Sequence, residues 1–371
     1  MSAGALQSVL APLRLSQAKT TALVVEAIAE MAQAASLRIA ASLAQATGCQ
    51  LASALTRFYR LLHNPRLDDL LLSRQMIAAA HPGPDPALIA MDWTEWHSSL
   101  RMLLGSLVAG RRAIPVCSQV FAKSEVLRSQ NVWENNFLRL LGLILKDLGL
   151  SACILADRGF RRVSFLKLLL THPNLTFVVR LCDQVIVEDK LRKSLLSDRG
   201  LQPGRAVDLG TVRLRQDAAV SVRVVGIWGK GQREPWWLAT NLEDPLARIA
   251  ALYDRRMAIE EQIRDTKGAR FGLKLVWTQI QTPAALARFA LIIGLTVLLL
   301  TAIGHVVVRN IPGVQLSCKK KGPRLSLLSV GQLFLPRAGL RSLSLASLRQ
   351  NIPAPAFRSF PWLEALQTPA S

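Results

Sequence analysis

The segment Tyr253–Lys267, with the sequence YDRRMAIEEQIRDTK, brings together residue types that serve phosphate chemistry: an aromatic hydroxyl, carboxylates and cations. In an α-helix each residue advances by about 100°, so Arg256, Glu260 and Lys267 would lie within about 60° of the tyrosine that begins the segment. A carboxylate on this face can bind a metal ion, and the cations beside it can hold a phosphate. The alternative is a solvated helix with i,i+4 ion pairs, as in most charge-rich helices.

The same predicted helix has an apolar stripe beside the charged row. Leu252, Ile259 and Ile263 form this stripe, so the helix can pack against a core while its charged row borders a cavity. Glu261 follows Glu260 directly but would point about 100° away from it. On a helix, Glu260 would therefore share the face of Tyr253, Arg256 and Lys267, and Glu261 would not.

Two aspartates lie where strands are predicted. The run Ala87–Trp96 (ALIAMDWTEW) predicts a buried strand that contains Asp92, and a carboxylate in an apolar strand is costly unless it is paired or bound to a metal. The short apolar run Ala152–Ala156 predicts another strand, which ends at Asp157. An aspartate at the exit of a strand can project into a site, and it is equally a common helix N-cap.

The rest of the central sequence predicts alternating strands and helices. Strands are predicted at Leu100–Val108, Ala113–Phe121 and Phe177–Leu181, and an amphipathic helix at Asn131–Leu148. Short β-segments broken by Gly and Pro follow at Ala206–Arg215, Ser221–Trp228 and Trp236–Thr240. The candidates for stacking on an unpaired or flipped base, worth about 1–3 kcal/mol per base, are Trp228, Trp236 and Trp237. Core packing is the expected role of each tryptophan taken singly.

The N-terminal part of the chain is predicted to be helical. Leu37–Ala46 and Leu51–Leu62 flank a Gly-containing turn, which is the layout of a helix-turn-helix. The second of these helices carries Arg57 and Arg60, which could contact phosphate. An ordinary helical hairpin fits the pattern equally well.

The composition favours a polyanionic partner. The chain of 371 residues has 46 Lys and Arg against 25 Asp and Glu, for a net charge of +21. An excess of this size indicates nucleic acid or an acidic membrane surface. The five cysteines show no CxxC or Cys/His pairing, which is typical of reduced cysteines in a cytosolic protein, and no export signal is evident at the N-terminus.

One apolar segment, Phe289–Val308, contains no Lys, Arg, Asp or Glu and is long enough to span a membrane. A helix buried on all sides in an α/β core has the same hydropathy. We favour the buried helix, because the charged helix that precedes it needs an apolar backing. The basic tail that follows contains the run Lys319–Lys321 and two predicted short helices, Leu325–Leu335 and Gly339–Leu348.

Three sequence blocks together resemble the DDE transposases of the bacterial insertion-sequence "four" family. The first is Tyr-x2-Arg-x3-Glu-x6-Lys from Tyr253, the second is MDWT around Asp92, and the third is DRGF from Asp157. The predicted order of three strands, a helix and a fourth strand ending in aspartate resembles a ribonuclease-H-like core. The resemblance implies a mixed sheet with flanking helices, a β-rich insertion and an apolar helix at the position of Phe289–Val308.

The resemblance also implies the roles of individual residues. The implied catalytic and metal-binding residues are Asp92, Asp157 and Glu260. They would hold two Mg²⁺ ions, for which Mn²⁺ can substitute. The residues implied to contact DNA phosphate near the cleaved end are Tyr253, Arg256 and Lys267.

The implied activity is excision and integration of an insertion sequence by Mg²⁺-dependent cleavage and strand transfer at terminal inverted repeats. Relatives excise through a hairpin on the element ends. The implied partners are double-stranded DNA, at the repeats and at the target, and a second copy of the chain in a synaptic complex. The implied location is the nucleoid of the bacterial cytoplasm, with no membrane association.

The expected organisation is an α/β chain with five parts. Residues 1–82 form a helical DNA-binding domain, 83–182 the first part of the ribonuclease-H-like core, 183–243 the β-rich insertion, 244–310 the second part of the core, and 311–371 a basic tail for dimerisation or DNA contact.

Three other classes of protein fit part of the sequence. A metal-dependent nuclease with the same core would share the carboxylates but lack the Tyr-Arg-Lys face. A non-catalytic DNA-binding protein would account for the charge but not for a buried Asp92. A membrane protein anchored by residues 289–308 would account for the apolar run, and it would leave the three sequence blocks as coincidence.

Overall fold

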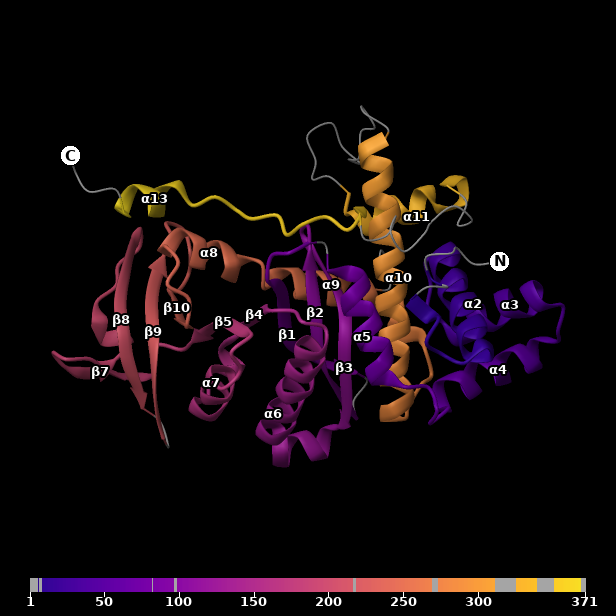
Figure 1. The fold of residues 1–371 in the computed structure, drawn as a ribbon, viewed down its shortest axis with the longest axis horizontal. Helices are drawn as coiled ribbons and strands as arrows, with labels where there is room; N and C mark the ends of the chain where they lie inside the picture. Colours follow the sequence, from indigo (N-terminus) through magenta and orange to yellow (C-terminus); the bar gives the residue numbers. More distant parts are fainter. Residues whose placement is uncertain are drawn as a thin grey trace. The chain divides into compact units, whose positions relative to one another are not determined.

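The computed structural model describes Leu6 and residues 9–81, 83–96, 99–215, 218–268, 273–310, 325–338 and 350–367. The chain is a mixed α/β protein (Figure 1), and its strands join in one mixed sheet with the order β3-β2-β1-β4-β5-β10-β9-β8-β6-β7. It divides into two units. Unit 1 comprises residues 1–84, 93–128 and 258–355, and unit 2 comprises residues 85–92, 129–257 and 356–371.

Unit 2 contains most of the strands. They are β1 (Ala87–Trp96, of which residues 87–92 belong here), β4 (Ala152–Ala156), β5 (Leu175–Leu181), β6 (Ile186–Glu188), β7 (Lys193–Leu195), β8 (Arg205–Arg215), β9 (Ala219–Trp228) and β10 (Trp236–Thr240). Its helical elements are the larger part of α6 (Lys123–Asp147, kinked at Ser129), η1 (Arg158–Phe160), α7 (Val163–Leu170), η2 (Ser197–Arg199), α8 (Leu246–Asp254) and α13 (Pro361–Gln367).

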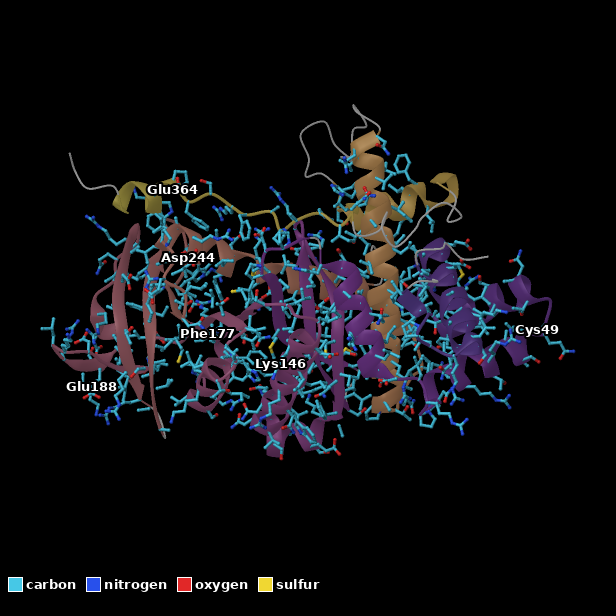
Figure 2. All side chains as sticks on the ribbon, viewed as in Figure 1. Cys49, Lys146, Phe177, Glu188, Asp244 and Glu364 are labelled. Carbon is cyan, nitrogen blue, oxygen red and sulfur yellow. The ribbon has the colours of Figure 1, made fainter. Side chains whose placement is uncertain are left out.

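The middle of this unit consists of three parallel strands, which antiparallel strands extend. β1 and β4 are parallel, with Ala87 opposite Ala152 and Met91 opposite Ala156, and β4 is parallel to β5. β10 then runs antiparallel to β5, and β9 to β10, so the predicted β-rich insertion extends this sheet. Phe177 of β5 is fully buried, and Figure 2 labels its position on the sheet.

Unit 1 is mainly helical. Its elements are α2 (Leu15–Met31), α3 (Ser36–Thr47), α4 (Leu51–His63), α5 (Asp69–Ala80), β2 (Leu100–Ala109), β3 (Arg112–Ala122), α9 (Met257–Lys267), η3 (Leu275–Trp277), α10 (Pro283–Asn310) and α11 (Leu327–Ala338). β2 and β3 form an antiparallel hairpin with an irregularity between Gly105 and Ser106. α10 contacts β3, α2, α4, α5 and α11.

α10 is the buried apolar helix that the sequence predicts. In the described part of the chain it is the one helix long and apolar enough to span a bilayer, and 83% of its most apolar window is buried. Two of its glycines lie where another backbone comes close. A Cβ on Gly294 would collide with the carbonyl oxygen of Pro115, and one on Gly304 with that of Leu327. In the same way, a Cβ on Gly331 of α11 would collide with the carbonyl oxygen of Leu300.

Most predicted strands and helices are confirmed. β1, β4 and β10 have the predicted bounds, and the two N-terminal helices flank Gly48, which ends α3 in the left-handed region. β6 and β7 were not predicted, and α6 begins earlier than expected. The predicted helix over 339–348 and the run Lys319–Lys321 lie outside the described residues.

The prediction of one helix over Tyr253–Lys267 is wrong. α8 ends at Asp254 and α9 begins at Met257. Between them, the amides of Arg255 and Arg256 donate to carbonyls three residues back, at 3.0 and 2.9 Å, and so tighten the chain into a turn. The helical angles counted from Tyr253 therefore do not apply. Glu260 and Lys267, seven residues apart on α9, still share a face.

Candidate active site

Two aspartates directly follow the last paired residues of β1 and β4. The last paired residues are Met91 and Ala156, so Asp92 and Asp157 are the next neighbours in register. The backbone of Asp157 is still extended, with φ −81° and ψ −178°. Because adjacent strands lie about 4.8 Å apart and residues in register point to the same face, the two half-buried carboxylates can act as a pair.

Asp157 also has the local role that its position allows. Its Oδ1 accepts a hydrogen bond from the backbone N–H of Gly159 at 2.8 Å and so caps the short helix η1. One carboxylate oxygen is therefore engaged with the backbone, which fixes the side chain at the end of β4. A carboxylate can cap a helix and still present its second oxygen to a cation.

Arg256 is the cation beside Asp92. Its Nη1 lies 3.4 Å from Oδ2 of Asp92, and the arginine is only 8% exposed. The turn between α8 and α9 brings this side chain to the end of β1. The positive charge of the buried guanidinium compensates part of the free-energy cost of burying the carboxylate of Asp92 in an apolar strand.

Tyr253 lies at the end of α8 in the same unit and is buried edge-on against Trp236, with ring centroids 5.0 Å apart. Burial raises the pKa of its phenol, and the positive charges of Arg256 and Arg180 lower it. Arg180 on β5 forms an ion pair with Glu234 at 2.7 Å and places its positive charge near the tyrosine. Sequence reasoning missed Arg180, although an arginine inside the apolar run LTFVVRL was a signal for it.

Glu260 and Lys267 belong to unit 1. Glu260 is exposed in the first turn of α9. The Nζ of Lys267 donates to Oγ1 of Thr94 at 2.7 Å and to the carbonyl of Glu95, both at the end of β1. Burial lowers the pKa of Lys267, and the negative charge of Glu95 raises it. This lysine therefore ties α9 to β1.

A network of polar contacts fixes α9 on the β2–β3 hairpin. Arg112 of β3 donates to Asp265 at 2.8 Å and lies 3.4 Å from Glu261. The buried hydroxyl of Ser106 donates to the side-chain carbonyl of Gln262 at 3.3 Å. These bonds hold the side of the helix that carries Glu261, Gln262 and Asp265, while Glu260 in the first turn is exposed.

The donor chemistry of the aspartate pair suits a hard divalent cation, because carboxylate oxygens are the ligands that Mg²⁺ and Mn²⁺ prefer. Among the residues that the structure describes, no group of three or more His, Cys, Asp or Glu side chains is placed to hold a metal ion. The third predicted ligand, Glu260, is separated in sequence by only three residues from Arg256, which contacts Asp92. Two of the three predicted carboxylates are thus neighbours in register.

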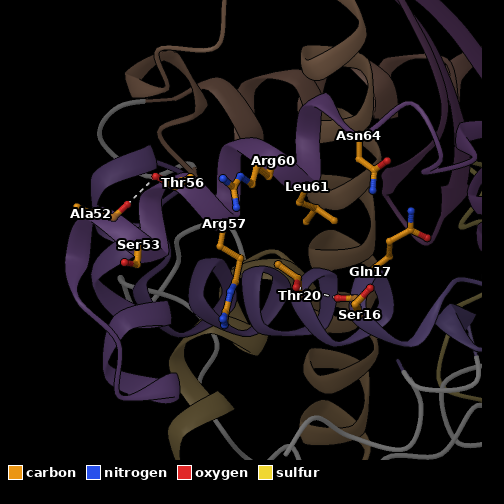
Figure 3. Close-up of a pocket in the computed structure, with 10 residues that line it drawn as sticks. All are labelled: Ser16, Gln17, Thr20, Ala52, Ser53, Thr56, Arg57, Arg60, Leu61 and Asn64. Atoms are coloured by element: carbon orange, nitrogen blue, oxygen red, sulfur yellow. Dashed lines mark hydrogen bonds between the residues drawn. The ribbon is translucent and has the colours of Figure 1, made fainter.

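Three other predicted site residues belong to other elements of the chain. Arg57 and Arg60 are exposed on α4 and line a groove that α4 shares with α2 (Figure 3). Trp237 is 2% exposed, and its ring packs where a Cβ on Gly226 would lie. The tryptophan fills the space over this glycine, as the alternative of core packing predicts, and stacking on a base stays an untested prediction.

The fold and the site define an α/β protein with a pair of strand-end aspartates, a buried arginine beside one of them and a charged helix close by in sequence. Comparison of the chain with protein-family models gives no match. Comparison with curated proteins gives none either. The functional proposal therefore depends on the sequence blocks and on the geometry.

Proposed function

We propose that this protein is a DDE-type transposase that cleaves and joins DNA strands at the ends of an insertion sequence. The observation that carries the proposal is the register of β1 and β4, whose last pair is Met91 and Ala156, so that Asp92 and Asp157 each follow that pair directly. These residues come from the MDWT and DRGF blocks, and two carboxylates that follow paired strands support a ribonuclease-H-like site. Arg256, from the third block, lies against Asp92.

The residues have separate roles in this proposal. Asp92, Asp157 and Glu260 would hold two Mg²⁺ ions, which supply activation of the attacking hydroxyl and stabilisation of the leaving oxygen. Arg256 neutralises Asp92 in the DNA-free protein and is positioned to exchange this partner for a phosphate, since a guanidinium binds either group. Lys267 holds the end of α9. Tyr253 supports the site from α8, and Arg180 supports it from β5.

The substrates in this proposal are the terminal inverted repeats and a target duplex, and two copies of the chain act together in the synaptic complex. Its location is the bacterial nucleoid. The basic composition supports a DNA substrate, since a net charge of +21 attracts a polyanion. The polar network around α9 supports a site in which the placement of one carboxylate matters.

The test is cleavage of DNA fragments that carry the two flanks of the coding region, with Mg²⁺ present and absent. Asp92→Asn, Asp157→Asn and Glu260→Gln should each abolish Mg²⁺-dependent cleavage while DNA binding persists. Asp85→Asn is the matched control, because Asp85 is exposed just before β1. It should cleave at the wild-type rate.

Two results would count against the proposal. Cleavage by Asp92→Asn at the wild-type rate would show that Asp92 is not a ligand of a catalytic metal ion. Cleavage by the wild-type protein without any joined product would assign the chain to the metal-dependent nucleases.

A further inference from the structure

A groove on the surface of unit 1 collects hydrogen-bond donors (Figure 3). α2 contributes residues around Gln17 to one wall, and α4 contributes Arg57, Arg60 and Asn64 to the other. The described residues that line the groove include two arginines and no Asp or Glu. Its chemistry is therefore that of a site for an anion.

The groove follows from the spacing of residues on α4. Arg57 and Arg60 are three residues apart and so lie on one face of the helix, and Asn64 follows as its C-cap. The same rule places Gln17 and Thr20 on the opposing face of α2. Leu61, 5% exposed, lies between the arginines and the amides and forms part of the floor.

Gln17 places an unpaired hydrogen-bond donor in this groove. The residue is 5% exposed, and its Oε1 accepts from the backbone N–H of Arg14 at 3.3 Å. Its Nε2 is buried without a hydrogen-bond partner among the described residues. In Figure 3 the amides of Gln17 and Asn64 point toward one another at one end of the groove. A buried donor without an acceptor costs about 1–3 kcal/mol, which a bound oxyanion would recover.

Among the described residues, no hydroxyl of the groove accepts a hydrogen bond from Nε2 of Gln17. Thr20 and Thr56 donate to the backbone carbonyls of Ser16 and Ala52 at 2.8 and 2.9 Å. Their protons are used within their own helices. The groups left to bind a ligand are two exposed guanidiniums and the amide donors, the set that proteins commonly use for DNA phosphates.

We propose that the α2–α4 groove binds the sugar–phosphate backbone of DNA, with phosphates held by Arg57 and Arg60 and a further contact from Gln17. The choice of DNA as the source of the phosphate rests on the proposed function and on the net charge of +21. The site differs from the helix-turn-helix of the sequence prediction, because α2 forms one wall and the exposed face of α3 takes no part.

The experiment measures binding of the full-length protein to a short fluorescent duplex in EDTA, across a series of salt concentrations. Arg57→Ala and Arg60→Ala should each weaken binding about tenfold, as expected for the loss of a charged hydrogen bond. Each should also reduce the slope of log K against log salt by about 0.9, the value for one phosphate contact. Arg38→Ala is the matched control, since it removes the same charge from an exposed site on α3.

Gln17 is tested separately. Gln17→Glu keeps the size and adds a negative charge, so binding should fall about tenfold, by 1.36 kcal/mol per factor of ten. Gln17→Met removes the donors without adding charge and should weaken binding by a smaller factor. Circular dichroism checks that both variants keep their helices.

Three outcomes would overturn the proposal. Equal weakening by Arg38→Ala and Arg57→Ala would mean attraction by net charge alone. Wild-type affinity of Gln17→Glu for the duplex would show that α2 does not contribute to the binding site. Complete displacement of the duplex by inorganic phosphate, with no effect of chloride at the same ionic strength, would make the groove a site for the free anion. Since EDTA prevents cleavage, a failure here is separate from a failure of the transposase chemistry.

Discussion

α9 and α10 follow one another in the chain and belong to the same unit, but different forces hold them. α9 is fixed by directional bonds: Arg112 to Asp265 and Glu261, Ser106 to Gln262, and Lys267 to the end of β1. α10 is fixed by close apolar packing. Its Phe289 meets Phe58 of α4 with ring centroids 5.6 Å apart, and Gly294 lets it contact the backbone of β3.

The difference means that α10 contributes mainly to the stability of the unit, whereas the bonds of α9 set the orientation of its side chains. Apolar burial is non-directional and supplies most of the folding free energy, so α10 can anchor the unit without fixing any particular side chain. Hydrogen bonds and ion pairs add little net free energy but set orientation. A catalytic carboxylate needs orientation, because a displacement of about 1 Å can cost roughly 100-fold in rate. We therefore expect changes in α10 to affect stability and changes in α9 to affect chemistry.

The largest effect is expected from a charge inside α10. Leu299 is fully buried, so Leu299→Arg places an unpaired charge in the core and should lower the free energy of unfolding by about 3–5 kcal/mol. Urea denaturation measures this change. Leu333→Arg is the control on α11, where the leucine is 61% exposed, and should change stability by at most about 0.5 kcal/mol. Equal stability of both variants would contradict the core role of α10.

The next effect concerns the two adjacent glutamates of α9. Glu260→Gln should slow single-turnover DNA cleavage by about 100-fold or more, because it removes the charge that would hold the cation. Glu261→Gln should cleave within a few-fold of the wild type. It loses ion pairs to Arg112 and Arg264, which are worth at most about 1 kcal/mol of stability. An inactive Glu261→Gln together with an active Glu260→Gln would contradict the prediction, because it would show that cleavage needs Glu261 and not Glu260.

A smaller effect tests the bonds that orient α9. Arg112→Met keeps the length of the side chain but breaks the contacts to Asp265 and Glu261, so cleavage should fall about tenfold through misplacement of the helix. Stability should fall by about 1 kcal/mol. Arg38→Met controls for the lost charge and should leave both quantities unchanged. A loss of stability without a loss of rate would show that these bonds do not orient Glu260.

The smallest effect is a pH dependence at Lys267. Because burial lowers the pKa of this lysine in the folded protein, the unfolded chain binds the proton more tightly between the lowered pKa and 10.5. The stability of the wild type relative to Lys267→Met should therefore rise with pH through this window and level off above it. Urea denaturation of both proteins at increasing alkaline pH measures the difference. A difference that falls with pH would mean that the charged form is the one favoured by folding.

The sequence predicted the strands well because their signal is local. Ala87–Met91 and Ala152–Ala156 are short apolar runs, each followed by a turn or a polar residue, and both form strands at the expected bounds. The apolar composition of α10 left two interpretations, which only its packing against other helices could separate. Local apolar patterns are therefore sufficient to predict such strands, whereas the environment of an apolar helix depends on the elements that pack against it.

The break between α8 and α9 could not be read from the sequence. The residues at the break are Asp254, Arg255 and Arg256, none of which is a Gly or Pro that would end a helix. The turn places Arg256 against Asp92, which is 164 residues earlier in the chain. A tertiary ion pair thus competes with local helix propensity. The buried amide of Gln17 is equally non-local, since its environment depends on α4.

The close packing at the glycines of α10 and α11 limits which substitutions these helices can accept. Every replacement of a glycine adds a Cβ, and at Gly294, Gly304 and Gly331 that atom would overlap a carbonyl oxygen of a neighbouring element. A random library selected for folded protein should therefore retain these three codons almost without variation. Positions such as Leu333, though apolar, should accept most substitutions. Sequence drift in this unit would thus be limited more by its smallest residues than by its largest.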